Sequence, residues 1–362
     1  MTLYLVNSQK MIIGLSFEGE HPCSVFELNK SSQYSVSMKK VLVAGGGGFI
    51  GGWLVKELLS MGYQVSAVDI KPLSEWYQVF PEARNSSRDL SLLDNCTQST
   101  VGIDEIYNLA ADMGGMGFIE NNKAACMLTV LINTHLLMAA KINGVSRYFF
   151  ASSACVYNAD KQNKSFIDPL KEDDAYPAMP EDGYGWEKLF SERMCRHFYE
   201  DYGLETRVGR YHNVYGPKGT WEGGREKAPA ALSRKVAESK LSKSNNIDIW
   251  GDGEQTRSFT YIRDCVYGTI KLMESNIREP LNIGSSEMVS INELTKIIEK
   301  IAGITLNPVY DLSAPKGVRG RNSDNSKILK LLNWEPKISL IEGLKETYLW
   351  VEQQVGKKLN AK

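Results

Sequence analysis

Short apolar runs along the chain alternate with longer segments in which apolar residues recur at helical spacing. The short runs predict strands at residues 41–44, 64–68, 103–109, 147–152 and 205–211. The longer segments predict helices at residues 49–61, 124–143 and 188–202. Such alternation is typical of a parallel sheet covered by helices on both faces, with right-handed crossover connections. We therefore expect an α/β fold with a doubly wound parallel sheet.

The pattern also predicts how the chain is divided. Residues 39–215 are expected to form the first domain, and residues 259–285 are a candidate to return to it. Beyond it the pattern loosens into loops rich in glycine, tryptophan and charge, so residues 216–355 are expected to form a smaller C-terminal region, followed by a tail at 356–362. Residues 1–38 do not fit the alternation. They are an extension of unknown role, for which an appendage, a leader and an upstream mis-start all stay open.

Composition and charge exclude several classes of protein. The 362 residues are 43% hydrophobic and 23% charged, which is ordinary for a soluble globular protein. The formal net charge of -1 gives no argument for nucleic acid or for an anionic membrane. No apolar run approaches the roughly 20 residues of a membrane helix, and the start of the chain lacks a signal-type segment. The six cysteines form no Cys-x-x-Cys pair, so we expect no metal site and a reducing, cytoplasmic location.

A glycine cluster, Gly45-Gly46-Gly47-Gly48-Phe49-Ile50-Gly51, lies between a predicted strand and a predicted helix. Its backbone can approach a pyrophosphate closely at the positive end of the helix, so Gly45, Gly48, Phe49, Ile50 and Gly51 are candidate cofactor contacts. Asp69 follows about 20 residues on, where it suits a ribose 2′-hydroxyl and repels a 2′-phosphate. The pattern favours NAD over NADP. The alternative is a structural turn with Asp69 as a helix cap.

Two further segments bear on the same cofactor. Asp89 could bond its adenine end or be a plain loop carboxylate. The segment 108–111 ends a predicted strand at the carboxyl edge of the sheet, where dinucleotides bind. Its two small alanines would let a cofactor pass close.

A Tyr-x-x-x-Lys pair supplies candidate redox chemistry. Tyr184 and Lys188 are four residues apart and share one face of a helix. A phenol normally loses its proton near pH ~10, and a neighbouring ammonium and nicotinamide cation would favour the phenolate. Tyr184 could then take a proton from a substrate hydroxyl. Such a pair is frequent by chance, but here it follows the glycine cluster and two serines. Ser153 would bond the reacting oxygen, and Ser152 is expected to be structural.

The glycine cluster, the serines and the Tyr184/Lys188 pair together resemble the extended short-chain dehydrogenase/reductase family, the NAD-dependent epimerases and dehydratases. The resemblance covers roughly residues 39 to 355 and implies a Rossmann-type NAD domain with a smaller C-terminal substrate-binding domain. Five segments resemble more narrowly the branch whose members epimerise GDP-mannose at C3 and C5: residues 110–118, 153–155, 216–221, 223–230 and 317–325.

The resemblance implies a reaction and an acid/base pair. Members of that branch oxidise C4 of the hexose with bound NAD, exchange protons at C5 and C3, and reduce C4 again. Inversion needs acid/base groups on both faces of the ring, and the resemblance assigns them to Cys155 and Lys227. We expect nearby cations to favour the thiolate, and burial or Arg225 to lower the pKa of Lys227. Without the resemblance, a small buried thiol and a solvated loop charge would be the ordinary interpretations.

The resemblance also implies a substrate-binding set. Arg321, Lys235 and Arg257 are candidates for the diphosphate, because cations and the arginine fork suit phosphate oxygens, although each alone could be a surface charge. Trp221 and Trp250 could pack or stack. The full set is Gly114, Ser153, Ala154, Cys155, Asn213, Glu226, Lys227, Ala228, Lys235, Gln255, Thr256, Arg257 and Arg321.

Other functions compete with this one. A 4,6-dehydratase of this type is expected to carry an Asp-Glu pair after its hydroxyl residue, where this chain has Ala154-Cys155. A simple 4-epimerase would not need Cys155 and Lys227 together, and a non-catalytic NAD-binding scaffold would not need Tyr184 and Lys188. By analogy with the family, we expect a homodimer formed through the helices near 124–143 and 188–202.

Overall fold

The computed structural model describes residues 4–5, 11–12 and 38–360, and the chain divides into two units at Met38. In the first unit, β1 (Tyr4–Leu5) pairs antiparallel with β2 (Met11–Ile12). The expected extension of unknown role otherwise lies outside the described residues. The second unit begins at Lys39, contains every other helix and strand described below, and is treated by itself.

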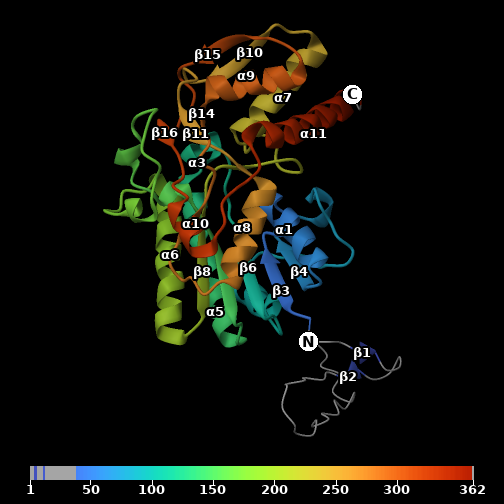
Figure 1. Cartoon of the computed structure of the whole chain (residues 1–362), viewed down its shortest axis with the longest axis vertical. Helices are drawn as coiled ribbons and strands as arrows, with labels where there is room; N and C mark the ends of the chain where they lie inside the picture. The colour runs from blue at the N-terminus through green and yellow to red at the C-terminus, as the bar shows by residue number, and fades with distance from the viewer. Residues whose placement is uncertain (1–3, 6–10, 13–37, 361–362) are drawn as a thin grey trace. The chain divides into compact units, whose positions relative to one another are not determined.

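A seven-stranded parallel sheet forms the centre of the second unit (Figure 1). Its spatial order is β13 (Leu281–Ile283), β8 (Glu205–Tyr211), β7 (Arg147–Ser153), β6 (Glu105–Asn108), β3 (Lys40–Ala44), β4 (Gln64–Asp69) and β5 (Arg84–Ser87). All neighbours pair in parallel. The strand order reverses between β3 and β6, which is the switch point of a doubly wound Rossmann-type sheet. The predicted fold class is confirmed.

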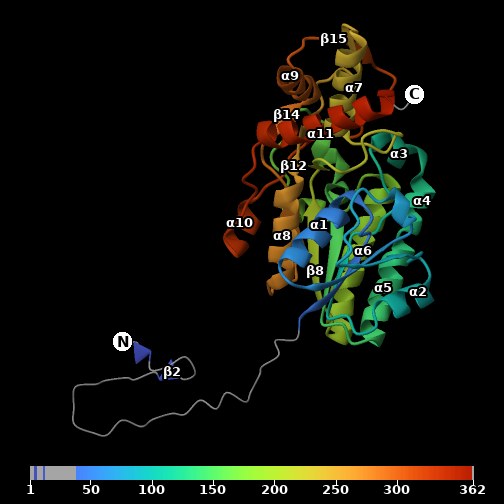
Figure 2. The ribbon, with the colours of Figure 1, turned by 90° about the vertical axis from the view of Figure 1, so that its right-hand side faces the viewer.

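Helices cover both faces of this sheet, as Figure 2 shows. One face carries α1 (Phe49–Ser60) and α8 (Ile262–Glu274), and the other carries α2 (Leu93–Ser99), α5 (Val130–Ile142) and α6 (Asp182–Tyr202). The strand β3 shows why: Val41 and Val43 join the buried apolar cluster on one face, and Leu42 and Ala44 join the cluster on the other. A strand buried on both faces must be apolar throughout.

The helix expected at 124–143 is interrupted. The structure has α4 (Lys123–Leu128) and α5, separated by Thr129, whose hydroxyl accepts a hydrogen bond from the Asp112 amide at 3.1 Å. The stretch Lys123–Ile142 also has the length of a membrane-spanning helix, and an 18-residue window within it is apolar enough, with a mean hydropathy of 1.6. The expectation that no such stretch exists is therefore wrong, although a helix that covers a sheet can pass the same test.

The C-terminal lobe lies beyond the carboxyl ends of the central strands (Figure 1). Its helices are α7 (Ala228–Ser242), α9 (Ile291–Ala302) and α11 (Leu340–Asn360), and the last of these runs through most of the expected tail. Two small sheets complete it: β10 (Asn246–Trp250) with β15 (Asn307–Asp311), and β14 (Met288–Ser290), β11 (Thr256–Ser258) and β16 (Gly320–Arg321).

Short elements connect the lobe to the sheet. The strand β9 (Val214–Tyr215) pairs in parallel with β12 (Thr260–Tyr261), after which α8 and β13 return the chain to the central sheet beside β8. The remaining elements are α3 (Met116–Asn121), α10 (Ser326–Leu332) and four short 3-10 turns, η1 (Leu73–Glu75), η2 (Ala154–Val156), η3 (Ala159–Gln162) and η4 (Glu172–Ala175).

Candidate active site

The glycine turn between β3 and α1 is shaped by close backbone contacts. Gly45 has a φ of +83°, and a Cβ there would lie 2.9 Å from the Ala110 nitrogen. A Cβ on Gly51 would lie 2.0 Å from the Gly45 oxygen, so a side chain cannot be accommodated. Gly48 caps α1 without a side-chain hydrogen bond, which leaves the first amides of the helix, at Phe49 and Ile50, directed at the turn.

Two residues that the sequence did not single out hold this turn from outside. Trp76 is only 7% exposed, and a Cβ on Gly47 would lie 2.4 Å from its indole ring. The indole nitrogen donates to the Lys71 oxygen at 3.0 Å, and the Lys71 amine donates to the Gly47 oxygen at 3.2 Å. The third glycine is therefore required by a tryptophan that packs against it.

The two predicted acids lie at the carboxyl edge of the sheet. Asp69 ends β4, and its carboxylate accepts from the Lys71 amide at 3.1 Å. Asp89 follows β5, and its carboxylate accepts from the Ser91 amide at 2.8 Å, a contact that suits a loop carboxylate. The turn, the open helix end and Asp69 fit the pyrophosphate and ribose of a dinucleotide.

Tyr184 and Lys188 both lie on α6, which begins six residues earlier than predicted. Lys188 is 2% exposed, and its amine lies 5.6 Å from the centre of the Tyr184 ring and 3.5 Å from a carboxylate oxygen of Glu187. Burial, and then the neighbouring Cys155, raise the pKa of Tyr184 well above its usual value. The pKa shift is therefore opposite to the expected lowering, because burial disfavours the charged phenolate.

Cys155 lies directly after β7, in η2. Its amide donates to the Ser153 hydroxyl at 3.2 Å, and Arg321 Nη1 donates to its sulfur at 3.5 Å. Burial raises the pKa of the Cys155 thiol, Glu181 raises it further, and Arg321 opposes both. The expectation that cations favour the thiolate is wrong in its net direction, because burial in an apolar surrounding dominates.

Lys227 is the N-cap of α7 and faces the same cavity as Cys155. Burial lowers the pKa of the Lys227 amine, Arg321 lowers it further, and the sulfur of Cys155 opposes both. Burial thus lowers the pKa of Lys227 as expected, but Arg225 does not contribute to the shift. The Arg225 guanidinium instead pairs with Asp112 at 2.6 Å and stacks on the Phe118 ring.

A cavity of about 270 Å³ brings most of the predicted residues together. Lys188 lies outside its wall, and so does Thr256, whose hydroxyl donates to the Ser165 oxygen. Wall residues that the sequence did not single out include Met116, Tyr211, Asp248, Phe259 and Lys316. The predicted residues in the wall are Gly114, Ser153, Ala154, Cys155, Tyr184, Asn213, Glu226, Lys227, Ala228, Lys235, Gln255, Arg257 and Arg321.

The three predicted phosphate-binding cations already have protein partners. Arg257 donates to the backbone oxygens of Thr256, at 2.7 Å, and Val318, at 2.6 Å, and burial lowers its pKa to about 10. Lys235 donates to the Asp248 oxygen at 2.7 Å. Arg321 is directed at the Cys155 sulfur, so it lies at the acid/base end of the cavity.

Three secondary expectations can be compared with the structure. Trp221 is buried in the core, whereas Trp250 is 46% exposed and lines the cavity. Ser152 is structural as predicted, since its hydroxyl donates to Glu192 at 2.5 Å and that carboxylate pairs with Arg210.

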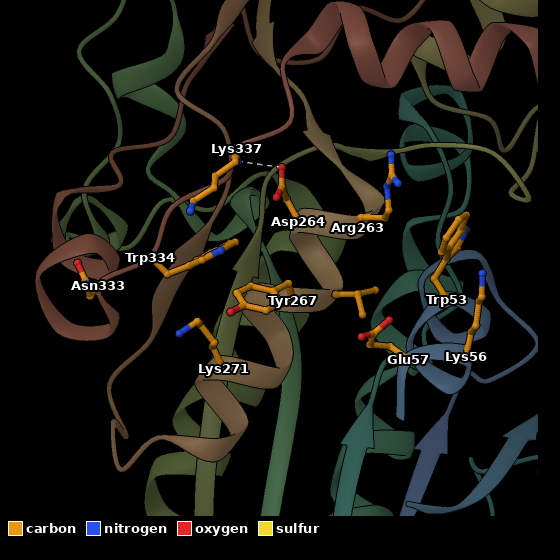
Figure 3. A pocket seen from close by; sticks show the side chains of 11 residues that line it. Trp53, Lys56, Glu57, Arg263, Asp264, Tyr267, Lys271, Asn333, Trp334 and Lys337 are labelled. Carbon is orange, nitrogen blue, oxygen red and sulfur yellow. Dashed lines mark hydrogen bonds between the residues drawn. The ribbon is translucent and has the colours of Figure 1, made fainter. Parts of the chain in front are cut away.

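A second, larger hollow of about 490 Å³ lies elsewhere, between α1, α8 and the turn at 333–337 (Figure 3). None of the predicted site residues lines it. The carboxylate of Asp264 in its wall accepts from the amides of Lys337, at 3.1 Å, and Ile338, at 2.8 Å, so this acid is already occupied. Reactive groups converge in the smaller cavity and not in this one.

This arrangement defines a class of protein: an α/β enzyme that uses a dinucleotide and acts on a hydroxylated substrate.

A model of the NAD dependent epimerase/dehydratase family matches residues 41–284. The rice (Oryza sativa subsp. japonica) protein GDP-mannose 3,5-epimerase 1 is 46% identical over 333 residues, 92% of this chain and 86% of its own. The Arabidopsis thaliana GDP-mannose 3,5-epimerase is 44% identical over 92% of this chain and 87% of its own.

Solved structures agree with the sequence relatives. A UDP-glucuronic acid 4-epimerase from Bacillus cereus, in complex with UDP-glucuronic acid and NAD, superimposes with a TM-score of 0.74 at 27% identity over 87% of this chain and 99% of its own. The chain therefore belongs to the NAD-dependent epimerase/dehydratase family. The predictions of an NAD cofactor and of an isomerase of the epimerase type are confirmed at the level of this family.

Proposed function

We propose that the protein is a GDP-mannose 3,5-epimerase that converts GDP-mannose to GDP-L-galactose. The observation that carries the proposal is the convergence of Cys155 and Lys227 on one cavity with Tyr184 and Ser153. The similarity to the two plant enzymes of that name supports the choice of substrate.

The first and last steps take place at C4 of the hexose. The glycine turn and Asp69 would hold NAD, which would supply reversible hydride chemistry at this carbon. Tyr184 accepts the proton of the C4 hydroxyl and later returns it, and Ser153 donates a hydrogen bond to the same oxygen. The Lys188 amine lies 5.6 Å from the centre of the Tyr184 ring, close enough for an ammonium group to stabilise the phenolate as it forms.

The middle steps exchange protons at C5 and C3. A ketone at C4 acidifies both neighbouring C–H bonds, and inversion requires removal on one face and delivery on the other. A lysine amine is ordinarily more basic than a thiolate, with pKa values near ~10.4 and ~8.5. Burial lowers the pKa of Lys227 and raises that of Cys155, which brings their proton affinities closer together. A matched pair can pass protons in either direction.

The remaining wall suits a nucleoside diphosphate. Arg257 and Lys235 are the basic residues of this part of the wall. Each donates to a backbone oxygen, and each side chain has further N–H donors that a phosphate could accept from. The side-chain oxygen of Gln255 is buried and accepts no hydrogen bond within the described part of the chain. It is available to accept one from a substrate amino or hydroxyl group. We assign the base as guanine on the similarity to the plant enzymes.

A 4,6-dehydratase or a 4-epimerase on the same fold fits the cavity less well. Ala154 and Cys155 stand where a dehydratase is expected to carry Asp and Glu, and a 4-epimerase has no use for a thiol facing an amine. A non-catalytic scaffold would not need Tyr184 and Lys188 buried together.

We also propose a homodimer formed through α4, α5 and α6. Apolar side chains at helical spacing are exposed there, namely Met127, Leu128, Leu131, Met138 and Ile142 on the first two helices and Trp186 and Phe190 on the third. Such a face is costly to leave in water. Light scattering should give twice the chain mass, and Leu131→Glu with Phe190→Glu should give a monomer. A wild-type monomer would disprove the dimer.

For the location we propose the cytoplasm. The described cysteines, Cys96, Cys126, Cys155, Cys195 and Cys265, are all free thiols, as is usual in a reducing compartment. Fractionation of the source cells, with antibody detection, tests this.

The function is tested with the purified protein and GDP-mannose, followed by NMR of the sugar protons. The expected result is an equilibrium mixture that contains GDP-L-galactose. Formation of only a C4 epimer, or of a 6-deoxy-4-keto sugar, would replace the proposal with one of the two alternatives.

A further inference from the structure

Glu181 is a partly buried acid that contacts Arg321 at the acid/base end of the cavity, and no role was predicted for it from the sequence. It is the N-cap of α6, three residues before Tyr184, and its amide donates to the backbone oxygen of Cys155 at 2.9 Å. Gly185, one turn further on, must lack a side chain, because a Cβ there would lie 2.3 Å from that same oxygen. The start of α6 is therefore built against Cys155.

The Glu181 carboxylate is also linked to Cys155 through the side chain of Arg321. Its Oε2 accepts from Arg321 Nη2 at 2.7 Å, while Arg321 Nε donates to Gln162 at 2.7 Å and Nη1 donates to the Cys155 sulfur at 3.5 Å. All three nitrogens of the guanidinium therefore have a side-chain partner, and two of these partners, Gln162 and Cys155, are buried. The ion pair leaves Arg321 side chain 5% exposed and Glu181 side chain 12% exposed.

The ion pair between Arg321 and Glu181 determines the net charge next to the Cys155 sulfur. Without Glu181, Arg321 would be an uncompensated cation in contact with the sulfur and would stabilise a thiolate. With Glu181, the cation is neutralised and a carboxylate stands next to the thiol. Although burial acts to raise the pKa of Glu181, Arg321 outweighs burial and lowers it, so the carboxylate is charged.

We propose that Glu181 is a positioning residue of the acid/base pair, which holds Arg321 against Cys155 and keeps the sulfur as a thiol in the resting enzyme. The acid/base role of Cys155 rests on the function proposed above, but the ionisation of its sulfur can be measured without turnover. Other charged or titratable groups also act on the sulfur and must stay constant in the test: Tyr184 on α6, Arg257 on β11, Arg321 on β16 and Lys227 at the start of α7.

The test is the pH dependence of alkylation of Cys155 by iodoacetamide in the NAD-loaded full-length protein, followed by mass spectrometry of its peptide. In Glu181→Gln the midpoint should fall by about one pH unit or more, since a like charge has been removed and Arg321 left unpaired. Alkylation at neutral pH should become several-fold faster, because only the thiolate reacts. The matched control is Asp182→Asn, whose carboxylate is half exposed and pairs with Lys123 at 2.5 Å.

The outcomes separate the two proposals. An unchanged midpoint in Glu181→Gln, or an equal shift in Asp182→Asn, overturns the role of Glu181, whatever the wild type does with GDP-mannose. A wild type that binds NAD but leaves GDP-mannose unchanged overturns the proposed function, and the alkylation result still stands. If Glu181→Gln does not fold, Glu181→Ala must show the same downward shift, and Glu181→Asp, which retains the charge, must not.

Discussion

The glycine turn and the acid/base cavity are held together by different kinds of contact. In the turn, backbone atoms meet backbone atoms, as between Gly51 and the Gly45 oxygen. In the cavity, side chains from separate elements meet, as Arg321 of β16 meets Cys155 of η2. The first region depends on the absence of side chains and the second on their identity. Substitutions should therefore impair cofactor binding in one region and proton transfer in the other.

The largest effect should come from the acid/base pair. Cys155→Ala and Lys227→Ala should each slow proton exchange at C3 and C5 by about 10²–10⁴-fold, the range for general acid/base groups, while NAD binding is kept. Exchange is followed by deuterium uptake from the solvent. Cys96→Ala and Lys240→Ala, which replace the same residue types away from the cavity wall, are the controls. Near-normal exchange in either active-site variant would rule out the assigned pair.

Tyr184→Phe should stop the reaction one step earlier. Without the phenol the C4 hydroxyl proton has no acceptor, so oxidation should fall by about 10²–10⁴-fold and no NADH absorbance should build up after substrate is added. Stopped-flow absorbance measures this. Tyr199→Phe, on the same helix, should behave as the wild type. Wild-type NADH formation in Tyr184→Phe would move the redox role elsewhere.

A substitution in the turn should affect the cofactor alone. The Cβ of Gly51→Ala would overlap the Gly45 oxygen and displace the turn. Overpacking of this kind costs about 1–3 kcal/mol, which corresponds to a loss of NAD affinity of about 5- to 150-fold. Calorimetric titration with NAD measures it. Gly62→Ala also has a positive φ but no atom within 4 Å of its Cβ, so it should lose stability without losing NAD affinity.

The smallest expected effect concerns the pH dependence of the free energy of unfolding. His212 follows β8 and is fully buried, and burial lowers its pKa to about 3. The unfolded chain takes up the proton near pH ~6.5, so stability is present above that pH and is lost as the pH falls toward 3, by about 1.4 kcal/mol per unit. Urea unfolding at several pH values should show this slope. His212→Asn should flatten it, and an unchanged slope would mean that other groups cause it.

The sequence was enough to predict the turn and the sheet, because their signals are local. Apolar runs identify β3, β4, β6, β7 and β8, and the spacing of glycines identifies the cofactor turn. The edge strand β5 (Arg84–Ser87) is polar and was not predicted. The break at Thr129 was not predictable, because it depends on a hydrogen bond from Asp112, a residue 17 positions away that no helical pattern reveals.

The electrostatics of the cavity were predicted only in part. Burial of Lys227 was expected and is present, but Arg225 was named as its neighbour where the structure has Arg321. Arg225 is closer in sequence, yet its guanidinium is drawn to Asp112. Glu181 carried one usable signal, since it lies three residues before Tyr184 and so shares a helical face with it. Its contact with Arg321, 140 residues away, required the folded chain.

The central claim is that the Cys155 thiol and the Lys227 amine exchange protons on opposite faces of one sugar. Deuterium incorporation from heavy water into GDP-mannose tests it most directly. The expected result is deuterium at both C3 and C5 of the recovered nucleotide sugar, lost at both positions in Tyr184→Phe and retained in Tyr199→Phe. Turnover of GDP-mannose to a new product with no label at either carbon would contradict it.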